Sequence, residues 1–268
     1  MCRCNIAAVS LWSVCLLSVF ALASCSPERA EMAQTEDRDG VLYLAGSDES
    51  FSGVISSTYP ELDQLLAETR YRNGLKHGRS VGYFENGQIS VEERFENGKR
   101  EGERVEWYEN GQMKRRETFV NDAVEGLLAE WDEEGLLLTE REMKEGQPDG
   151  VTVTWYPNGQ KKTEGTYERG ALHGVLVLWY ENGQKEAEKT YSRGFGNGPN
   201  TEWYESGEIR LQVDWRDGKP DGQFTRWFEN GQKQAEGLYQ DGNIVELQMW
   251  DEAGTLEPTD SLSRARRG

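Results

Sequence analysis

Aromatic residues and glycines recur along the chain with a period of 24 residues. We call the set of residues at one position of successive repeats a column, and there are two aromatic columns and two glycine columns. A fixed period of this length predicts a repeat architecture in which each unit packs on its neighbours. The first aromatic column is Tyr59, Tyr83, Trp107, Trp131, Trp155, Trp179, Trp203 and Trp227, followed by Trp250 after 23 residues. The second column is Tyr71, Phe95, Phe119, Met143, Tyr167, Tyr191, Trp215 and Tyr239.

Each repeat contains two segments with the pattern of a β-strand. Residues 151–156 alternate strictly with period two, which is typical of a strand with one buried side. Asn-Gly follows the aromatic pair, as at Asn110-Gly111, and this dipeptide favours a tight hairpin. A second glycine turn, such as Arg169-Gly170, closes the other end. The sequence therefore predicts two antiparallel strands per repeat.

The alternation also predicts which side chains share a face of the sheet. Val153 and Val177 are two residues before a tryptophan of the first column, so we expect them to share its face. In the second strand, odd positions hold Val91, Leu211 and the second aromatic column, while even positions are mostly charged or polar. These patterns predict one apolar face that contains both aromatic columns, and one polar face.

The predicted fold is all-β: an elongated antiparallel β-meander of about eight 24-residue two-stranded repeats over residues 41–255. Periodicity leaves open whether this single sheet is open or partly rolled. Asp63 and Asp122 replace turn glycines and Asp132 replaces a tyrosine, so we expect irregular first and third units.

The chain begins with the pattern of an export signal. Arg3 precedes an apolar run over residues 6–23, which predicts a signal peptide over residues 1–24. The residues Leu22-Ala-Ser-Cys25 resemble the lipobox of bacterial lipoproteins, which implies cleavage before Cys25 and acylation of that residue. Two or more acyl chains anchor a protein stably in a bilayer. An ordinary secretory peptide and an uncleaved helix ending in cysteine are the alternatives.

The segments that flank the array differ from it in composition. Residues 25–40 are predicted to be an acidic tether, and residues 256–268 a disordered basic tail. Ser26 follows Cys25, which favours the outer membrane, on its periplasmic or surface face, in a Gram-negative host. Three of the four cysteines lie in the predicted signal, so the mature chain keeps one thiol and no disulfide.

The formal net charge of −18 restricts the partners of the chain. A strongly acidic protein repels phosphate backbones, which excludes nucleic acid as an expected partner. Solubility alone accounts for such a charge, and a partner with basic patches is the alternative.

The motif WYENGQ, followed by the spaced glutamate, tyrosine and two glycines, is similar to the MORN repeat variant of bacterial exported proteins. The resemblance extends from about Gly53 to Gly254. Some members of this family are classed as YwqK-type antitoxins. The resemblance implies a β-meander that is used for interactions, and an antitoxin or immunity role as one form of that use.

No residue pattern predicts catalysis. The two histidines, His77 and His173, occupy equivalent positions four repeats apart, so they are too far separated to share a metal or form a catalytic pair. One glutamate per repeat lies at the Asn-Gly turns, spaced too widely to chelate a cation: Glu85, Glu109, Glu133, Glu181, Glu205 and Glu229. We expect no enzyme activity, no metal and no cofactor.

The adjacent aromatic pairs are the better candidate for binding. If the tryptophan of each pair points inward, its neighbour lines the opposite face and could stack on a sugar ring or anchor a protein. Cross-strand stabilisation of the sheet is the alternative interpretation. The candidate binding residues are Tyr108, Tyr156, Tyr180, Tyr204 and Phe228.

Together these patterns predict a repeat lipoprotein that is anchored to the membrane through acylated Cys25 and binds a protein or a glycan in the cell envelope. The alternative is an antitoxin or immunity-like protein that neutralises a toxin.

Overall fold

The computed structural model describes residues 28–62 and 64–258. The predicted signal peptide, Cys25, Asp63 and most of the basic tail lie outside the described residues. The chain divides into two compact units, residues 1–104 and 105–268. The elements of the first unit are β1 (Arg29–Glu31), the 3-10 helix η1 (Met32–Gln34), β2 (Thr35–Arg38), β3 (Val41–Leu44), β4 (Gly53–Thr58), β5 (Leu65–Arg72), β6 (Leu75–Tyr83), β7 (Ile89–Glu96) and β8 (Lys99–Arg100).

Strand β9 (Gly102–Trp107) contains the boundary between the units. The strands of the second unit are β10 (Met113–Val120), β11 (Ala123–Trp131), β12 (Leu137–Lys144), β13 (Gln147–Trp155), β14 (Lys161–Glu168), β15 (Ala171–Trp179), β16 (Lys185–Ser192), β17 (Phe195–Trp203), β18 (Ile209–Arg216), β19 (Lys219–Trp227), β20 (Lys233–Gln240) and β21 (Asn243–Met249).

The first unit begins with a folded cap rather than the tether predicted over residues 25–40. From Arg29 onward the chain is ordered into strands: β1 pairs in parallel with β4, and β2 pairs with β3. Ala30 is buried with Leu42, Phe51 and Ile55 in a small core. Burial of these side chains stabilises the segment although most residues around Ala30 are charged or polar. Residues 29–38, within the segment predicted as a tether, thus form two strands and a 3-10 helix and pack in the first unit.

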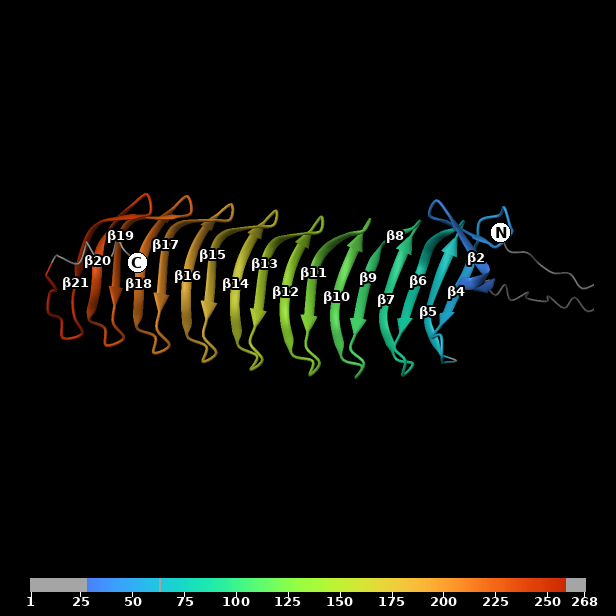
Figure 1. The fold of residues 1–268 in the computed structure, drawn as a ribbon, viewed down its shortest axis with the longest axis horizontal. Helices are drawn as coiled ribbons and strands as arrows, with labels where there is room; N and C mark the ends of the chain where they lie inside the picture. The colour runs from blue at the N-terminus through green and yellow to red at the C-terminus, as the bar shows by residue number, and fades with distance from the viewer. Residues whose placement is uncertain (1–27, 63, 259–268) are drawn as a thin grey trace, which may run out of the picture. The chain divides into compact units, whose positions relative to one another are not determined.

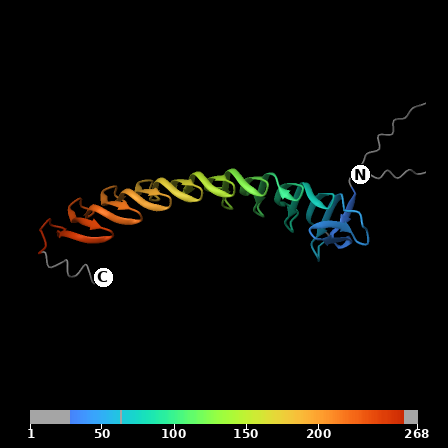
Figure 2. The same ribbon diagram turned by 90° about the horizontal axis from the view of Figure 1, so that it is seen from above.

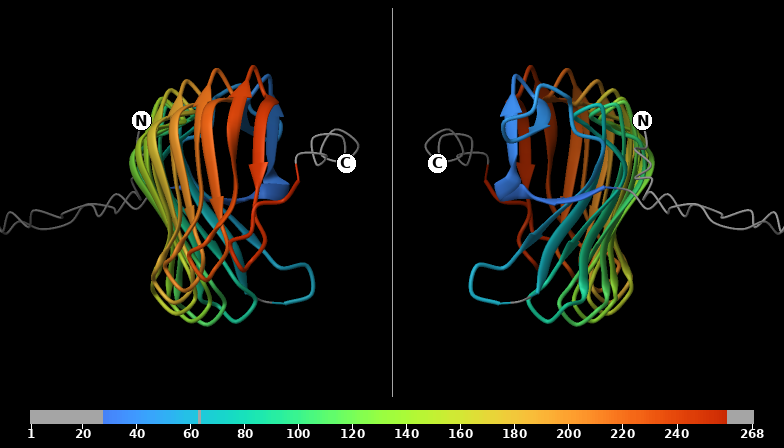
Figure 3. Two further views of the ribbon diagram at one scale, coloured as in Figure 1. Left: turned by 90° about the vertical axis from the view of Figure 1, so that its left-hand side faces the viewer. Right: turned by 90° about the vertical axis from the view of Figure 1, so that its right-hand side faces the viewer.

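The second unit is a meander in which each strand pairs with its neighbours in the sequence. Strands β10 to β21 lie side by side in chain order (Figure 1), and the same succession is seen from above in Figure 2. All the pairs between consecutive strands of this unit are antiparallel, as Lys144 opposite Gln147 illustrates. Each strand is bowed along its length (Figure 3). The predicted all-β class and the two strands per repeat are confirmed, and the meander is open.

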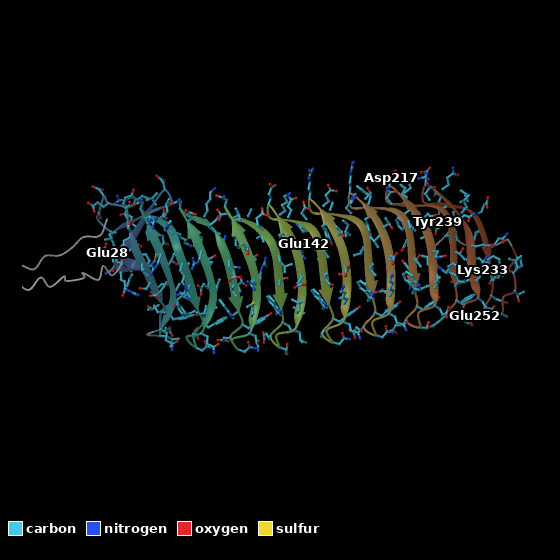
Figure 4. All side chains as sticks on the ribbon, turned by 180° about the vertical axis from the view of Figure 1, so that it is seen from behind. Glu28, Glu142, Asp217, Lys233, Tyr239 and Glu252 are labelled. Atoms are coloured by element: carbon cyan, nitrogen blue, oxygen red, sulfur yellow. The ribbon has the colours of Figure 1, made fainter. Side chains whose placement is uncertain are left out.

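Two kinds of turn alternate along the meander and lie at its two opposite edges. Figure 4 labels one example of each in the second unit, Asp217 at one edge and Glu252 at the other. We name them the X-Gly edge and the Asn-Gly edge. At the X-Gly edge both central residues have positive φ, 50° for Arg169 and 81° for Gly170, which is the type I′ hairpin conformation. At the Asn-Gly edge only the glycine has positive φ, as at Gly159.

The prediction that both aromatic columns share one apolar face is wrong. Across the Asn-Gly turns, even positions of the first strand lie opposite odd positions of the second: Thr154 faces Thr163, and Val153 faces Glu164. The two columns predicted on one side therefore lie on opposite sides. The cause is the length of the turn, which sets the register of the hairpin.

The two faces of the second unit are therefore both mixed in character. We call one of them the valine face, since it has Val153 and Val177 opposite Glu164 and Glu188. The other is the aromatic face, because the second aromatic column lies on it: Tyr167, Tyr191, Trp215 and Tyr239, beside the column Thr152, Leu176, Asn200 and Phe224.

The tryptophans of the first column are not core residues. None of them is among the buried side chains of the described residues, whereas Phe95, Phe119 and Phe224 are. A sheet that is one layer thick has no second layer to cover a large ring. The third repeat, which contains Asp122 and Asp132, is regular, because Asp122 adopts φ 69° in the turn.

Candidate functional site

The tyrosines predicted as a binding row lie at the Asn-Gly edge, where they connect one repeat to the next. The hydroxyl of Tyr156 donates to the backbone carbonyl of Trp179 at 2.8 Å, and that of Tyr180 donates to Trp203 at 2.8 Å. Tyr108 and Tyr204 make the equivalent bonds, whereas Phe228 has no hydroxyl. Because these hydroxyls are already bonded, the geometry favours the alternative interpretation of the row, which is stabilisation of the sheet.

The environment of these tyrosines perturbs their acidity. Burial raises the pKa of Tyr156, and the carboxylates of Glu186 and Glu181 raise it further. Burial likewise raises the pKa of Tyr108 and of Tyr180. A phenol that donates a hydrogen bond from a partly desolvated position resists ionisation. The hydroxyls therefore stay protonated at neutral pH and remain donors.

Other residues that recur in most repeats make similar contacts. The side-chain amide of Asn158 donates to the carbonyl of Glu181 in the next repeat at 2.8 Å, while its oxygen accepts from the backbone N–H of Gln160. At the X-Gly edge the N–H of Gly170 donates to the carbonyl of Pro148 in the preceding repeat at 2.7 Å. The recurring tyrosines, asparagines and glycines of the repeat thus make the bonds that hold neighbouring repeats together.

The histidines and the turn glutamates have local partners. His173 lies 3.8 Å from Glu168, and the imidazole of His77 accepts from the N–H of Asn97 at 3.5 Å. Glu133 and Glu181 accept through their backbone carbonyls from turn asparagines. Within residues 28–62 and 64–258, no group of three histidine, cysteine or acidic side chains is placed to hold a metal ion.

The aromatic face, in contrast to the edges, differs from repeat to repeat. Near β10 it contains Glu117, which is 2 % exposed and accepts from Arg115 at 2.8 Å. Further along it becomes aliphatic around Leu176. It then becomes polar again at Lys189 and Asn200.

Two adjoining hollows lie in this last region, between β16 and β20. One, of about 120 Å³, is lined by Lys189, Thr190, Tyr191, Gly196, Asn200 and Trp215. The other, of about 150 Å³, shares Lys189, Asn200 and Trp215 and adds Glu202, Leu211, Val213, Pro220, Phe224, Arg226 and Tyr239. Tyr239 is labelled on β20 in Figure 4. The hollows are the candidate site.

Glu202 is held in its charged form at the rim. Its carboxylate accepts from Arg210 at 2.8 Å and pairs with Lys189 at 3.1 Å. Burial raises the pKa of Glu202, but the bonds to Lys189 and Arg210 outweigh this and lower the pKa overall. The rim is thus a charged network at neutral pH.

The sequence prediction missed these residues because each one belongs to a regular column. The available signal was that three residues of one repeat differ from those at the same positions in the neighbouring repeats. Gly196 occupies a position that holds Leu172 one repeat earlier and Pro220 one repeat later, and Trp215 replaces the tyrosine found at Tyr191. Asn200 follows Leu176 in its own column. The three residues occur together in one repeat.

Comparison with known proteins identifies the repeat. Five segments of the chain match the MORN repeat variant family. They are residues 76–97, 100–121, 148–169, 172–193 and 220–241. Each matched segment contains two paired strands and the Asn-Gly turn that joins them. Gly196, Asn200 and Trp215 lie outside the five matched segments. No curated protein matches the sequence.

Two solved structures show a slight likeness to the chain, the crystal structures of TcdB2-TccC3-Cdc42 and of TcdB2-TccC3. Both are 14% identical to it, and the matches cover 78% and 79% of this chain. The chain spans only 14% and 15% of the solved chains, with TM-scores of 0.20 and 0.18. A likeness this slight bears on neither fold nor function. In the part of the chain that the structure describes, no helix has the length and apolar composition needed to cross a membrane.

Proposed function

We propose that this chain is a repeat scaffold of the cell envelope, anchored through acylated Cys25, and that it binds a protein or glycan partner on its aromatic face. The observation that supports this is the contrast between the edges and the face. Tyrosine, asparagine and glycine recur at the edges and bond successive repeats. The face changes from Glu117 through Leu176 to Asn200. Constant edges suit a scaffold, and a varied face suits recognition of one partner.

The charge of the chain and its repeat architecture favour binding over catalysis. The hollows are small, about 120 and 150 Å³, and no nucleophile with an adjacent base is found among the residues that line them. A charge of −18 also makes nucleic acid an unfavourable partner.

Anchoring is tested by fractionating a Gram-negative host that expresses the full chain. Cys25→Ser removes the thiol that would be acylated, so we expect the chain to move from the membrane pellet to the soluble periplasmic extract. Cys15→Ser, within the predicted signal, is the matched control and should leave the chain in the pellet. An uncleaved Cys25→Ser chain would still pellet through its apolar residues 6–23, so incorporation of labelled palmitate is the deciding readout. Equal labelling of the Cys25→Ser chain and the unaltered chain would contradict acylation of Cys25.

Binding is tested by crosslinking in intact cells with two neighbouring variants. Leu176→Lys places a charge on the aromatic face, whereas Val175→Lys places one on the opposite side of the same strand, where Val175 is 45% exposed. We expect Leu176→Lys alone to reduce the recovered partner. Equal recovery from both variants would contradict binding on the aromatic face. A recovered toxin would instead support the antitoxin role.

A further inference from the structure

Two polar atoms at the hollows are buried without a hydrogen-bond partner. Asn200 is only 6% exposed, and its Oδ1 has no partner. The indole Nε1 of Trp215 is buried in the same way. An unpaired buried donor or acceptor destabilises the folded state, so such groups are rare unless something else satisfies them. One unpaired acceptor and one unpaired donor lie at the same site.

Aromatic side chains form much of the wall of the site. Gly196 leaves room for the indole of Trp215, since a Cβ at this glycine would lie 3.2 Å from Cε3 of that ring. Tyr191 lines the first hollow. In the second, Phe224 and Tyr239 pack together with ring centroids 4.8 Å apart. Aromatic rings present a negative face that attracts polarised C–H groups.

The charged side chains around the hollows are mostly cationic, whereas those of the chain as a whole are mostly anionic. Lys189, Glu202 and Arg226 line the second hollow, and Arg210 is bonded to Glu202. Three cations therefore surround one carboxylate. Charges further away than about 8 Å are screened at physiological salt, so these neighbours decide the local potential rather than the net charge of the chain.

We propose that Asn200, Trp215 and Lys189 form a subsite for one sugar ring of an acidic glycan. This inference rests on the proposed function and names the ligand class of its binding face. A sugar hydroxyl is both donor and acceptor, so it can satisfy the indole N–H and the amide oxygen together. The ring packs on the aromatic walls, and its carboxylate pairs with Arg226 or Lys189.

A peptide fits these features less well. Extended peptides bind by pairing as a new strand beside an unpaired outer strand of a sheet, but β16 to β19 are each paired on both sides. A folded partner would need a larger surface than two hollows of about 120 and 150 Å³. A single ring matches both the size of the site and its polar atoms.

The test is calorimetric titration of the full purified chain with two probes. One is a tetrasaccharide of alternating glucuronic acid and N-acetylglucosamine, and the other is the neutral chitotetraose. Asn200→Leu replaces the unpaired amide with an apolar side chain of similar volume, so the chain should fold at least as stably. Arg226→Gln removes one rim cation at an exposed position. Thr152→Val is the matched control, because Thr152 is a buried, unpartnered hydroxyl of the same column away from the hollows.

We expect the acidic tetrasaccharide to bind about tenfold more tightly than the neutral one, a difference that one charge-assisted bond supplies. Asn200→Leu should weaken binding by about tenfold or more. Arg226→Gln should reduce the preference for the acidic probe, and Thr152→Val should change nothing. Binding of neither probe would overturn the inference, as would unchanged binding by Asn200→Leu. If the crosslinked partner is still recovered in either case, the proposed function stands while the subsite fails.

Discussion

The two edges of the sheet hold the same repeats together by different means. At the Asn-Gly edge, side chains form the bonds: the hydroxyl of Tyr180 and the amide of Asn182 both reach the next repeat. At the X-Gly edge, the backbone forms them, through N–H groups such as that of Gly170. The first edge therefore depends on residue identity. The second depends on backbone conformation, so residue identity is less restricted: Asn97, Glu145, Arg169 and Asp217 all occupy its first turn position with φ of 50°.

The largest effect is expected from a β-branched residue at a turn glycine. Gly170 has φ 81°, and a Cβ there would meet nothing closer than 3.6 Å, so the cost of substitution is conformational only. Gly170→Val should lower the free energy of unfolding by about 2 kcal/mol, measured by urea denaturation. Gly170→Asn should cost well under half as much, because asparagine tolerates this region. Equal losses in the two variants would disprove the dependence on backbone conformation.

A smaller effect is expected at the other edge. Tyr180→Phe removes the bond to Trp203 and should destabilise the chain by about 1 kcal/mol in the same assay. Tyr167→Phe is the control, since no hydrogen bond of the Tyr167 hydroxyl is found in the described part of the chain. It should change stability by only a few tenths of a kcal/mol. A similar loss in both variants would mean that the inter-repeat bond contributes nothing specific.

The comparison of the two edges also predicts a substitution that stabilises the folded chain. Arg169 adopts φ 50°, a conformation that costs most side chains free energy but suits asparagine. Arg169→Asn should therefore raise the free energy of unfolding by about 0.5 kcal/mol. The same exchange at Arg226, within a strand, should not stabilise, since asparagine disfavours strands. Thermal unfolding of both variants distinguishes the two outcomes.

The smallest effect is a dependence on alkaline pH to which the tyrosines of the Asn-Gly edge contribute. Burial raises the pKa of Tyr108, Tyr156 and Tyr180 above 10.0, so the folded chain holds these protons more tightly than the unfolded chain. Their contribution to stability is fully present below the unfolded pKa and is lost as the pH rises through the folded pKa. Urea midpoints should fall from about pH 9.5 upward. Replacing all three with phenylalanine should make that fall less steep, while Tyr71, whose pKa burial also raises, remains. An unchanged slope would contradict the assignment.

The period and the turns were readable from the sequence because each reflects a local requirement. Asn-Gly and X-Gly pairs indicate hairpins, and alternation indicates strands. The assignment of faces failed because it depends on how many residues each turn contains, which decides whether Val153 lies opposite an odd or an even position. One residue of difference moves every side chain to the other side.

The folded cap and the hollows could not be predicted from the sequence, for a different reason. The burial of Ala30 depends on Phe51, a partner about twenty residues away that belongs to no repeat. The hollow at Asn200 exists only where β16, β17 and β18 lie together, so each departure looked like a tolerated substitution within its column. Both features depend on contacts between residues of different columns or outside the repeats. The periodicity of a single column gives no information about such contacts.

A sheet of single thickness grows in a way that a globule cannot. A globular domain must enlarge its interior to gain surface, whereas here an inserted pair of strands brings its own bonds at each edge, such as those of Asn158 and Gly170. Recognition surface then increases in direct proportion to chain length. Duplication of one unit would lengthen the array without disturbing a specialised position such as Trp215, which leaves that position free to diverge.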